Sequence, residues 1–403
     1  MNKVVDHAVK VDLHIHSVFS EHKDGKKVRN NTIDKLNVLI SKLNENNVNV
    51  CSITDHDLFS FDLYSKLKEE EGKGSIQKVL PGVEFSVEYE HNEEKAVIHV
   101  VTLFDDSDKE KIKKIEKIIN GKDNKPIYDL KGAFSEKKFL EIMKSIDLDT
   151  IMIAHQKNSL TSKSVRKNDA NSLGNNKFEE FLFTEYFEAF EFRNKDYEVF
   201  MNNYIIEEKA QELLRMITGS DCHDWEVYPH IISEDEKEGF VYTWLKCLPT
   251  FKGIVMAMTD YRRIKKNDSF FNPSKNYVHE IDFTINGSKL KVPLSKGINV
   301  IIGENSIGKS LLLHELTDYV KEAGGLSKTL RTSYEQHMID NNYSIETKVL
   351  QDSVYIFDMQ GEIRKNFEEH KLKGKNFISR YFPENIDTTE YETIIDTEIN
   401  NYC

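Results

Sequence analysis

The first two thirds of the chain alternate short apolar runs, rich in β-branched residues, with amphipathic stretches. This alternation is typical of a parallel βα architecture, and it predicts barrel-like wiring. Helices are expected where apolar residues recur at spacings of three and four, at residues 32–47, 135–146 and 199–214. Seven strands are predicted, at residues 10–17, 48–57, 78–86, 96–104, 149–155, 187–194 and 216–224.

A polar interval at residues 265–276 breaks this rhythm. Beyond it, two apolar runs meet at Asn286 and Gly287, a pair that favours a tight hairpin because both residues tolerate positive φ. The pattern therefore predicts a first domain over residues 1–265, a linker over 266–280 and a second domain over 281–403.

Histidines and carboxylates gather at the predicted strand ends. The run VDLHIHSVFSEH places two histidines on one side of a strand, because alternate strand residues share a face. Active sites of parallel barrels collect at the C-terminal strand ends. The residues of metal-ligand type near these ends are His14, His16, Glu21, Asp55, His56, Glu84, His99, His155, Asp221 and His223.

Each of these residues alone is more often a satisfied core or rim side chain than a ligand. Converging on one rim, however, imidazoles and carboxylates would destabilise one another without cations between them. Mixed nitrogen and oxygen ligands suit Zn, Mn or Fe. Two or three such ions, about 3.5 to 4 Å apart, form the arrangement that cleaves phosphoesters.

The motifs DLHIHS, ITDHD, GVEFS, IAH and GSDCHD, in this order over residues 9–264, resemble the polymerase and histidinol phosphatase (PHP) family. The resemblance implies a distorted (β/α)7 barrel with a trinuclear metal site. The family usually has Asp where Glu21 stands, and a longer carboxylate can still reach a metal. The implied metal ligands are His14, His16, Glu21, His56, Glu84, His99, His155, Asp221 and His223, of which all but Glu21 and His99 are also predicted to be catalytic.

The second domain carries a phosphate-loop motif, GENSIGKS, between an apolar run predicted as a strand and an amphipathic run predicted as a helix. In such a loop, backbone N–H groups cradle phosphates, the lysine reaches the β and γ phosphates and the serine holds Mg²⁺. The sequence therefore predicts an ATP and magnesium site. Its expected members are Gly303, Asn305, Gly308, Lys309 and Ser310.

Downstream, the segment DSVYIFDMQGEI has two interpretations. Asp358 imitates a Walker B carboxylate, whereas Gln360 resembles the Q-loop of ABC-type heads of the SMC and DNA-repair class, which we favour. No LSGGQ-like signature follows, so the resemblance covers the N-terminal half of an ABC/SMC-like P-loop ATPase head. Bacterial proteins that join a PHP domain to such an ATPase are similar, and several of them act in antiphage defence.

Composition limits the partners. The formal net charge is −13, so no global positive field attracts nucleic acid, and a phosphate-bearing substrate needs local cations. One local cationic stretch, residues 157–177 after His155, is either a solvated loop or a flexible clamp on a nucleic-acid backbone. The four cysteines form no CxxC pair, and no signal peptide or membrane span is evident. A cytoplasmic protein without membrane contact is expected.

These features together predict a metal-dependent nuclease, with DNA or another nucleic acid as substrate, gated by an ATP-binding domain. An incomplete ATPase head also predicts a homo-oligomer. Two alternatives remain open: a phosphatase of small molecules or nucleotides, and a nucleotide-gated binding or assembly protein with a structural metal site.

Overall fold

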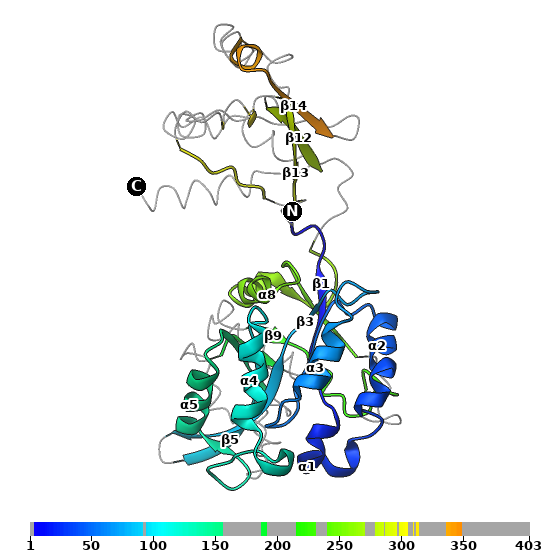
Figure 1. Cartoon of the computed structure of the whole chain (residues 1–403), viewed down its shortest axis with the longest axis vertical. Helices are drawn as coiled ribbons and strands as arrows, with labels where there is room; N and C mark the ends of the chain where they lie inside the picture. The colour runs from blue at the N-terminus through cyan, green and yellow to red at the C-terminus, as the bar shows by residue number, and fades with distance from the viewer. Residues whose placement is uncertain are drawn as a thin grey trace, which may run out of the picture. The chain divides into compact units, whose positions relative to one another are not determined.

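The structure is a computed structural model, shown in Figure 1. It describes residues 4–91, 94–155, 187–191, 215–230 and 240–270, and parts of residues 279–348. The described residues fall into two compact units, one within Val5–Asn272 and the other beyond Pro273. The predicted helix at 199–214, the basic segment 157–177, Asp358 and Gln360 lie outside the described residues.

The strands of the first unit form two sheets. One has the order β11-β10-β1-β2-β3 and consists of β1 (Val9–Ile15), β2 (Val50–Ile53), β3 (Lys78–Val79), β10 (Thr243–Leu245) and β11 (Ile264–Lys265). The other has the order β6-β4-β5-β7-β8-β9 and consists of β4 (Gly82–His91), β5 (Glu94–Phe104), β6 (Phe134–Ser135), β7 (Thr150–His155), β8 (Ala189–Glu191) and β9 (Met216–Ile217).

Two isolated β-bridges join these sheets into a closed cycle. Ile15 at the end of β1 pairs with Cys222, which follows β9, and His56, which follows β2, pairs with Glu84 of β4. Each of the seven predicted strands overlaps a strand of this cycle, so the predicted mixed α/β pattern is confirmed. The order around the cycle is β1, β2, β4, β5, β7, β8 and β9.

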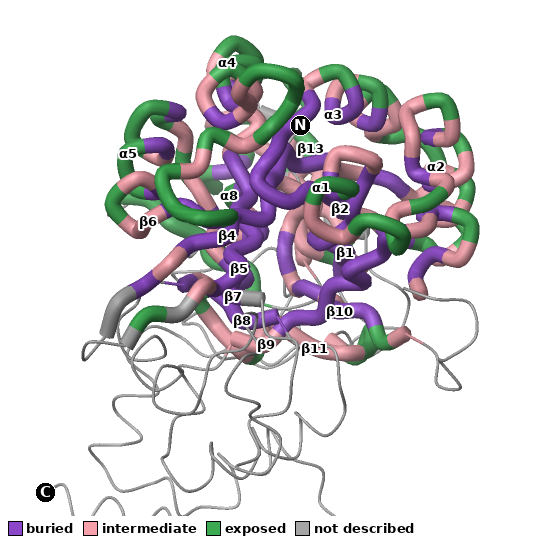
Figure 2. Tube along the Cα trace, turned by 90° about the horizontal axis from the view of Figure 1, so that it is seen from below, coloured by how far each residue is buried: buried purple, intermediate pink, exposed green. Residues whose placement is uncertain are grey.

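Helices lie along part of the rim of this unit, outside the strands, with their exposed faces turned outward (Figure 2). In α4 the buried residues Ile112, Ile115 and Ile119 recur at helical spacing, and the side chain of Asp108 caps the first turn. One apolar cluster packs α2 to α5 against the strands, and a second packs α8 against them. The helices are α1 (Glu21–Asp24), α2 (Leu36–Glu45), α3 (Phe61–Lys68), α4 (Lys109–Ile119), α5 (Glu136–Ile146) and α8 (Phe251–Met258).

The expectation of an all-parallel barrel is wrong at β5. This strand runs antiparallel to both β4 and β7. Only two residues separate β4 from β5, too few for the crossover that a parallel pair requires, so these strands form a hairpin. The predicted strand at 78–86 also divides into β3 and β4, because Pro81 has no N–H to donate to a ladder.

The described part of the second unit is an antiparallel sheet with the order β13-β12-β14, formed by β12 (Glu280–Ile285), β13 (Ser288–Pro293) and β14 (Tyr343–Lys348). The predicted hairpin is confirmed, and Gly287 in its turn has a φ of 79°. The strand predicted before Gly303 is not observed. Residues 298–304 form no strand, and Ile298 and Ile302 are 91% and 90% exposed. No described segment pairs with this run, so its backbone has no ladder to join.

Candidate metal centre

The HxH pair of β1 places both imidazoles in one buried cluster. Nε2 of His14 and Nε2 of His16 are 3.0 Å apart. Oδ1 of Asp221 lies 3.1 Å from the His16 nitrogen and 3.8 Å from the His14 nitrogen. Oε2 of Glu84 lies 3.2 Å from the His14 nitrogen and 3.4 Å from the His16 nitrogen. Two nitrogens of β1, one oxygen of β4 and one oxygen from the segment after β9 therefore converge in this first group.

Glu84 belongs to a second group as well. Its Oε2 is 2.9 Å from Nδ1 of His56, and its Oε1 is 3.0 Å from Nδ1 of His99. Oε2 of Glu84 therefore faces nitrogens of both groups, and Oε1 faces the second group alone, so this carboxylate is shared between the two groups. His155, expected in the same region, ends β7 in register with Glu191 of β8, and its side chain lies outside the described residues.

Asp24 completes a third group, in the place where the sequence predicts Glu21. Oδ2 of Asp24 is 2.9 Å from Nε2 of His56 and 2.9 Å from Nε2 of His223. Glu21 begins α1 and is exposed, whereas Asp24 ends the helix and turns inward. The structure therefore brings Asp24 into the cluster and leaves Glu21 outside it. One signal for Asp24 was available: it is an aspartate in the same short segment as Glu21, and the motif pattern that the sequence resembles usually has aspartate there.

The three groups fit divalent metal ions. Three buried atoms of these groups lie 2.9 Å from another polar atom, yet the angles do not suit a hydrogen bond. They are Oδ2 of Asp24, Nδ1 of His56 and Nε2 of His223. Atoms that aim at a common point rather than at one another have this geometry. Ligands about 2.1 Å from a shared ion lie about 3.0 to 3.4 Å apart, which is close to the spacings observed.

A neutral imidazole offers one lone pair, so each histidine can serve one ion. His56 faces Glu84 with Nδ1 and Asp24 with Nε2, and it can therefore join the second group or the third, but not both.

Carboxylate and hydroxyl partners orient the first two imidazoles. Nδ1 of His14 donates to Oε1 of Glu191, 2.7 Å away, which leaves Nε2 for the cluster. Such a carboxylate fixes the tautomer of a ligating histidine and increases its basicity. Gly219 makes room for this pair, because a Cβ there would lie 2.3 Å from Oε2 of Glu191. Sequence reasoning missed Glu191, since a carboxylate inside a predicted strand has no spacing that marks its partner.

Asp55 supports the cluster without facing it. Its Oδ1 accepts from the Ser17 amide at 2.6 Å and from Oγ of Ser20 at 2.7 Å, and Oγ of Ser20 lies 2.9 Å from Nδ1 of His16. On the opposite side, Nδ1 of His223 donates to the carbonyl oxygen of Asp221 at 2.7 Å. Both histidines therefore present Nε2 to the cluster.

Without ions, the buried imidazoles and carboxylates of the cluster shift one another's pKa values. Burial lowers the pKa of His56, but the carboxylates of Glu84 and Asp24 outweigh it and raise that pKa to about 10. Burial and the neighbouring imidazole of His223 lower the pKa of His16 to about 3. Burial raises the pKa of Glu84, but the imidazoles of His56 and His14 hold it well below its usual range. Protons on some histidines thus balance the buried carboxylates, and metal ions can take over that role.

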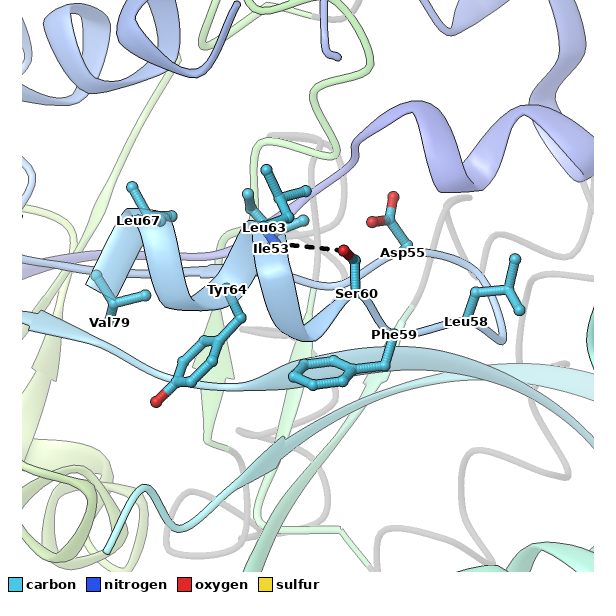
Figure 3. Close-up of a pocket in the computed structure, with 10 residues that line it drawn as sticks. Ile53, Asp55, Leu58, Phe59, Ser60, Leu63, Tyr64, Leu67 and Val79 are labelled. Atoms are coloured by element: carbon cyan, nitrogen blue, oxygen red, sulfur yellow. Dashed lines mark hydrogen bonds between the residues drawn. The ribbon is translucent and has the colours of Figure 1, made fainter. Parts of the chain in front are cut away.

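The cluster is most accessible beside Asp24 and His99. The side chains of His14 and Glu84 are fully buried, whereas those of Asp24 and His99 are 15% and 11% exposed. A separate cavity of about 10 Å³ lies between α3 and the strands, lined mostly by apolar side chains such as Leu63 and Leu67 (Figure 3). It has room for about one water molecule. Among the described residues, the cluster is therefore open to solvent on the side of Asp24 and His99.

Fold and site together define a mixed α/β protein whose histidine and carboxylate groups can bind metal ions. No protein-family model matches the chain, and no curated protein matches it.

Several solved structures resemble it, among them the following three. PsfC from Pseudomonas syringae is 16% identical over 59% of this chain and 82% of its own, with a TM-score of 0.33. A protein assigned as a metal-dependent phosphoesterase from Bifidobacterium adolescentis is 11% identical over 62% of this chain and 95% of its own, with a TM-score of 0.35. An amidohydrolase from Chromobacterium violaceum, with bound sulfate and no metal, is 14% identical over 64% of this chain and 99% of its own, with a TM-score of 0.36. Because all three TM-scores are below 0.5, the functional interpretation rests on the side chains of the site.

In the second unit, Lys309 folds back onto the predicted phosphate loop. Its Nζ donates to the carbonyl oxygens of Gly303 at 2.7 Å and Glu304 at 2.5 Å. Asn305, Gly308, Ser310 and Gln360 lie outside the described residues. Within the described part of the chain, no helix has the length and apolar character needed to cross a membrane.

Proposed function

We propose that the first unit is a metal-dependent phosphoesterase of the PHP type that cleaves nucleic acid. The observation that carries this proposal is the position of Glu84, whose carboxylate faces His14 and His16 on one side and His99 on the other. A carboxylate in this position would be available to two ion-binding groups, and neighbouring divalent ions would supply the chemistry of phosphoester cleavage.

Charge balance favours an anionic substrate. The described cluster contains three carboxylates, from Asp24, Glu84 and Asp221, and five histidines that bind metals in the neutral form. Two divalent ions carry four positive charges and three carry six. With the carboxylate of Glu191 beside His14 counted as a fourth negative charge, three ions give the loaded site a net positive charge. A phosphoester fits this field better than a neutral amide, although the chain as a whole is acidic.

When bound, divalent ions supply a water of lowered pKa and polarise the phosphoryl oxygens. The protein supplies the rest. Glu191 and Ser20 hold the imidazoles of His14 and His16 in place before the substrate arrives, so little reorganisation accompanies the reaction. Burial of the cluster excludes bulk water and strengthens each charge interaction.

The test uses protein reconstituted with Mn²⁺, Zn²⁺ or Fe²⁺ and three substrate classes: p-nitrophenyl phosphate, bis(p-nitrophenyl) phosphate, and linear or single-stranded DNA and RNA. We expect hydrolysis of the diester and of nucleic acid. His16→Ala removes a ligand of the first group, while His22→Ala alters an exposed histidine outside the cluster and serves as the matched control. Equal activity of the two variants, or metal content without hydrolysis of any phosphoester, would refute the proposal.

We also propose that the second unit binds ATP and modulates the first. The support is the contact of Lys309 with the carbonyl oxygens of Gly303 and Glu304, which holds a cation where the motif expects a phosphate. Lys309→Ala should abolish any response of cleavage or of oligomer size to ATP while metal content stays the same. An identical response of this variant and the wild type across an ATP titration would leave the second unit without a nucleotide role.

A further inference from the structure

We propose that Lys23 forms a subsite for a second anionic group of the substrate, next to the metal cluster. The hydroxyl groups of Ser86 and Tyr128 lie beside it and donate to Asp57. This inference rests on the proposed function and deepens it. According to this inference, the substrates of the site are phosphoesters that carry a second negative charge nearby, such as a further phosphate of a nucleic-acid strand.

The register of β4 places this subsite. Glu84 and Ser86 are two residues apart on β4 and thus share a face, with about 6.6 to 6.8 Å between their Cα atoms. Ser86 pairs with His99 across the β4–β5 hairpin. Nζ of Lys23 donates to Oγ of Ser86. The ammonium group therefore lies one strand step from Glu84, on the accessible side of the cluster beside His99.

The charge of Lys23 is only partly engaged. Its Nζ lies 2.8 Å from Oδ2 of Asp57, a fully buried carboxylate, while the Lys23 side chain is 21% exposed. Asp57 has other donors, since it accepts from the Ser86 amide at 2.6 Å and from Oη of Tyr128 at 2.7 Å. An ammonium has three N–H groups, and the described residues offer oxygen partners for two of them. One donor remains for an anion.

A competing explanation is that Lys23 only anchors α1. Lys23 precedes Asp24, so its contact with Asp57 also helps to fix the carboxylate that faces His56 and His223. A structural anchor would affect metal content and all substrates alike. A subsite would affect substrates according to their second charge, and this difference defines the experiment.

The experiment uses the full-length, metal-loaded chain. The substrates are a thymidine dinucleotide, the same dinucleotide with an added 5′- or 3′-phosphate, and bis(p-nitrophenyl) phosphate, which has no second charge. The readout is the ratio of kcat/KM with the added phosphate to kcat/KM without it. Lys23→Met should lower this ratio about tenfold, as loss of one charge-assisted contact implies. Lys23→Arg should restore most of it, and Lys26→Met, at an exposed lysine of the same segment, should leave the ratio within about twofold.

Three results would overturn the inference. The first is an equal ratio of kcat/KM values in Lys23→Met and wild type, with bis(p-nitrophenyl) phosphate still cleaved. This result would refute the subsite but not the proposed function. The second is a loss of bound metal in Lys23→Met with an unchanged ratio, which assigns Lys23 to anchoring alone. The third is wild-type protein that hydrolyses none of these substrates, in which case the proposed function fails and the subsite fails with it.

Discussion

Replacing Asp24 by Asn should release a metal ion, whereas replacing Glu21 by Gln should not. The two residues lie in the same short helix, and both changes remove one negative charge with little change of shape. Only Asp24 contacts the cluster, with Oδ2 placed 2.9 Å from nitrogens of both His56 and His223. The pair of variants therefore separates the effect of a ligand from the effect of charge near the site.

The magnitude follows from the ligand count. In the described residues, Asp24 provides the carboxylate of a group whose other members are the imidazoles of His56 and His223. Loss of a partner that merely orients a ligand costs about 10- to 100-fold in metal affinity, and loss of the ligand itself should cost at least about 100-fold, or about 2.7 kcal/mol. The ions held by His14, His16 and Glu84 should stay bound.

The assay is metal content per chain after dialysis against a graded chelator series, with wild type, Asp24→Asn and Glu21→Gln treated in parallel. We expect Asp24→Asn to hold one ion fewer than wild type. Glu21→Gln should hold as many ions as wild type. The melting temperature in excess metal should fall for Asp24→Asn only, because weaker binding stabilises the folded state less. Loss of the ion in Glu21→Gln but not in Asp24→Asn would show that the exposed residue is the ligand in solution.

Three further predictions concern the surroundings of the cluster. Glu191→Gln should weaken metal binding about 10- to 100-fold with little loss of fold, measured by competition with a chromophoric chelator; unchanged affinity would mean that the carboxylate does not tune His14. Gly219→Ala should lower the melting temperature even without metal, because its Cβ would lie 2.3 Å from Oε2 of Glu191 and 2.6 Å from Cβ of His14; wild-type melting would contradict the close approach. The pKa of His56 is raised from 6.5 to about 10, so its contribution to the stability of the metal-free protein should be complete below pH 6.5 and lost as the pH rises to about 10. Urea unfolding in chelator at pH 6, 8 and 10 measures this loss, and equal unfolding free energies would show that His56 is not held protonated by Glu84 and Asp24.

The strand ends and their ligand types could be predicted from the sequence because both depend on local patterns. The alternation in β1 fixes the shared face of His14 and His16, and the structure places their Nε2 atoms 3.0 Å apart. The order of the strands explains why Glu84 and Asp221 meet them. Glu84 belongs to β4, so its position is set by the register of the sheet. Asp221 lies four residues beyond β9, and its amide donates to the carbonyl oxygen of His14.

Residues whose position depends on a loop or on a distant partner could not be predicted in the same way. Asp24 reaches the cluster through the conformation of α1, and no spacing rule distinguishes it from Glu21 three residues earlier. Asp55 has the residue type of a ligand, yet it binds the amide and hydroxyl groups that hold His16. The antiparallel direction of β5 depends on the short β4–β5 connection, and the apolar pattern of β5 itself does not indicate direction.

The two bridges that close the barrel also bear on when the protein becomes active during its own synthesis. His16 and Asp221 lie 205 residues apart in the chain, and the bridge from Ile15 to Cys222 forms beside them. Contacts between such distant residues close the longest loops, so they carry a large entropic cost and tend to form late in folding. A chain still emerging from the ribosome lacks Asp221 and His223 until most of this unit has been made. The metal cluster is therefore incomplete in every unfinished chain, and the activity proposed for it cannot begin before Asp221 and His223 have joined the other residues.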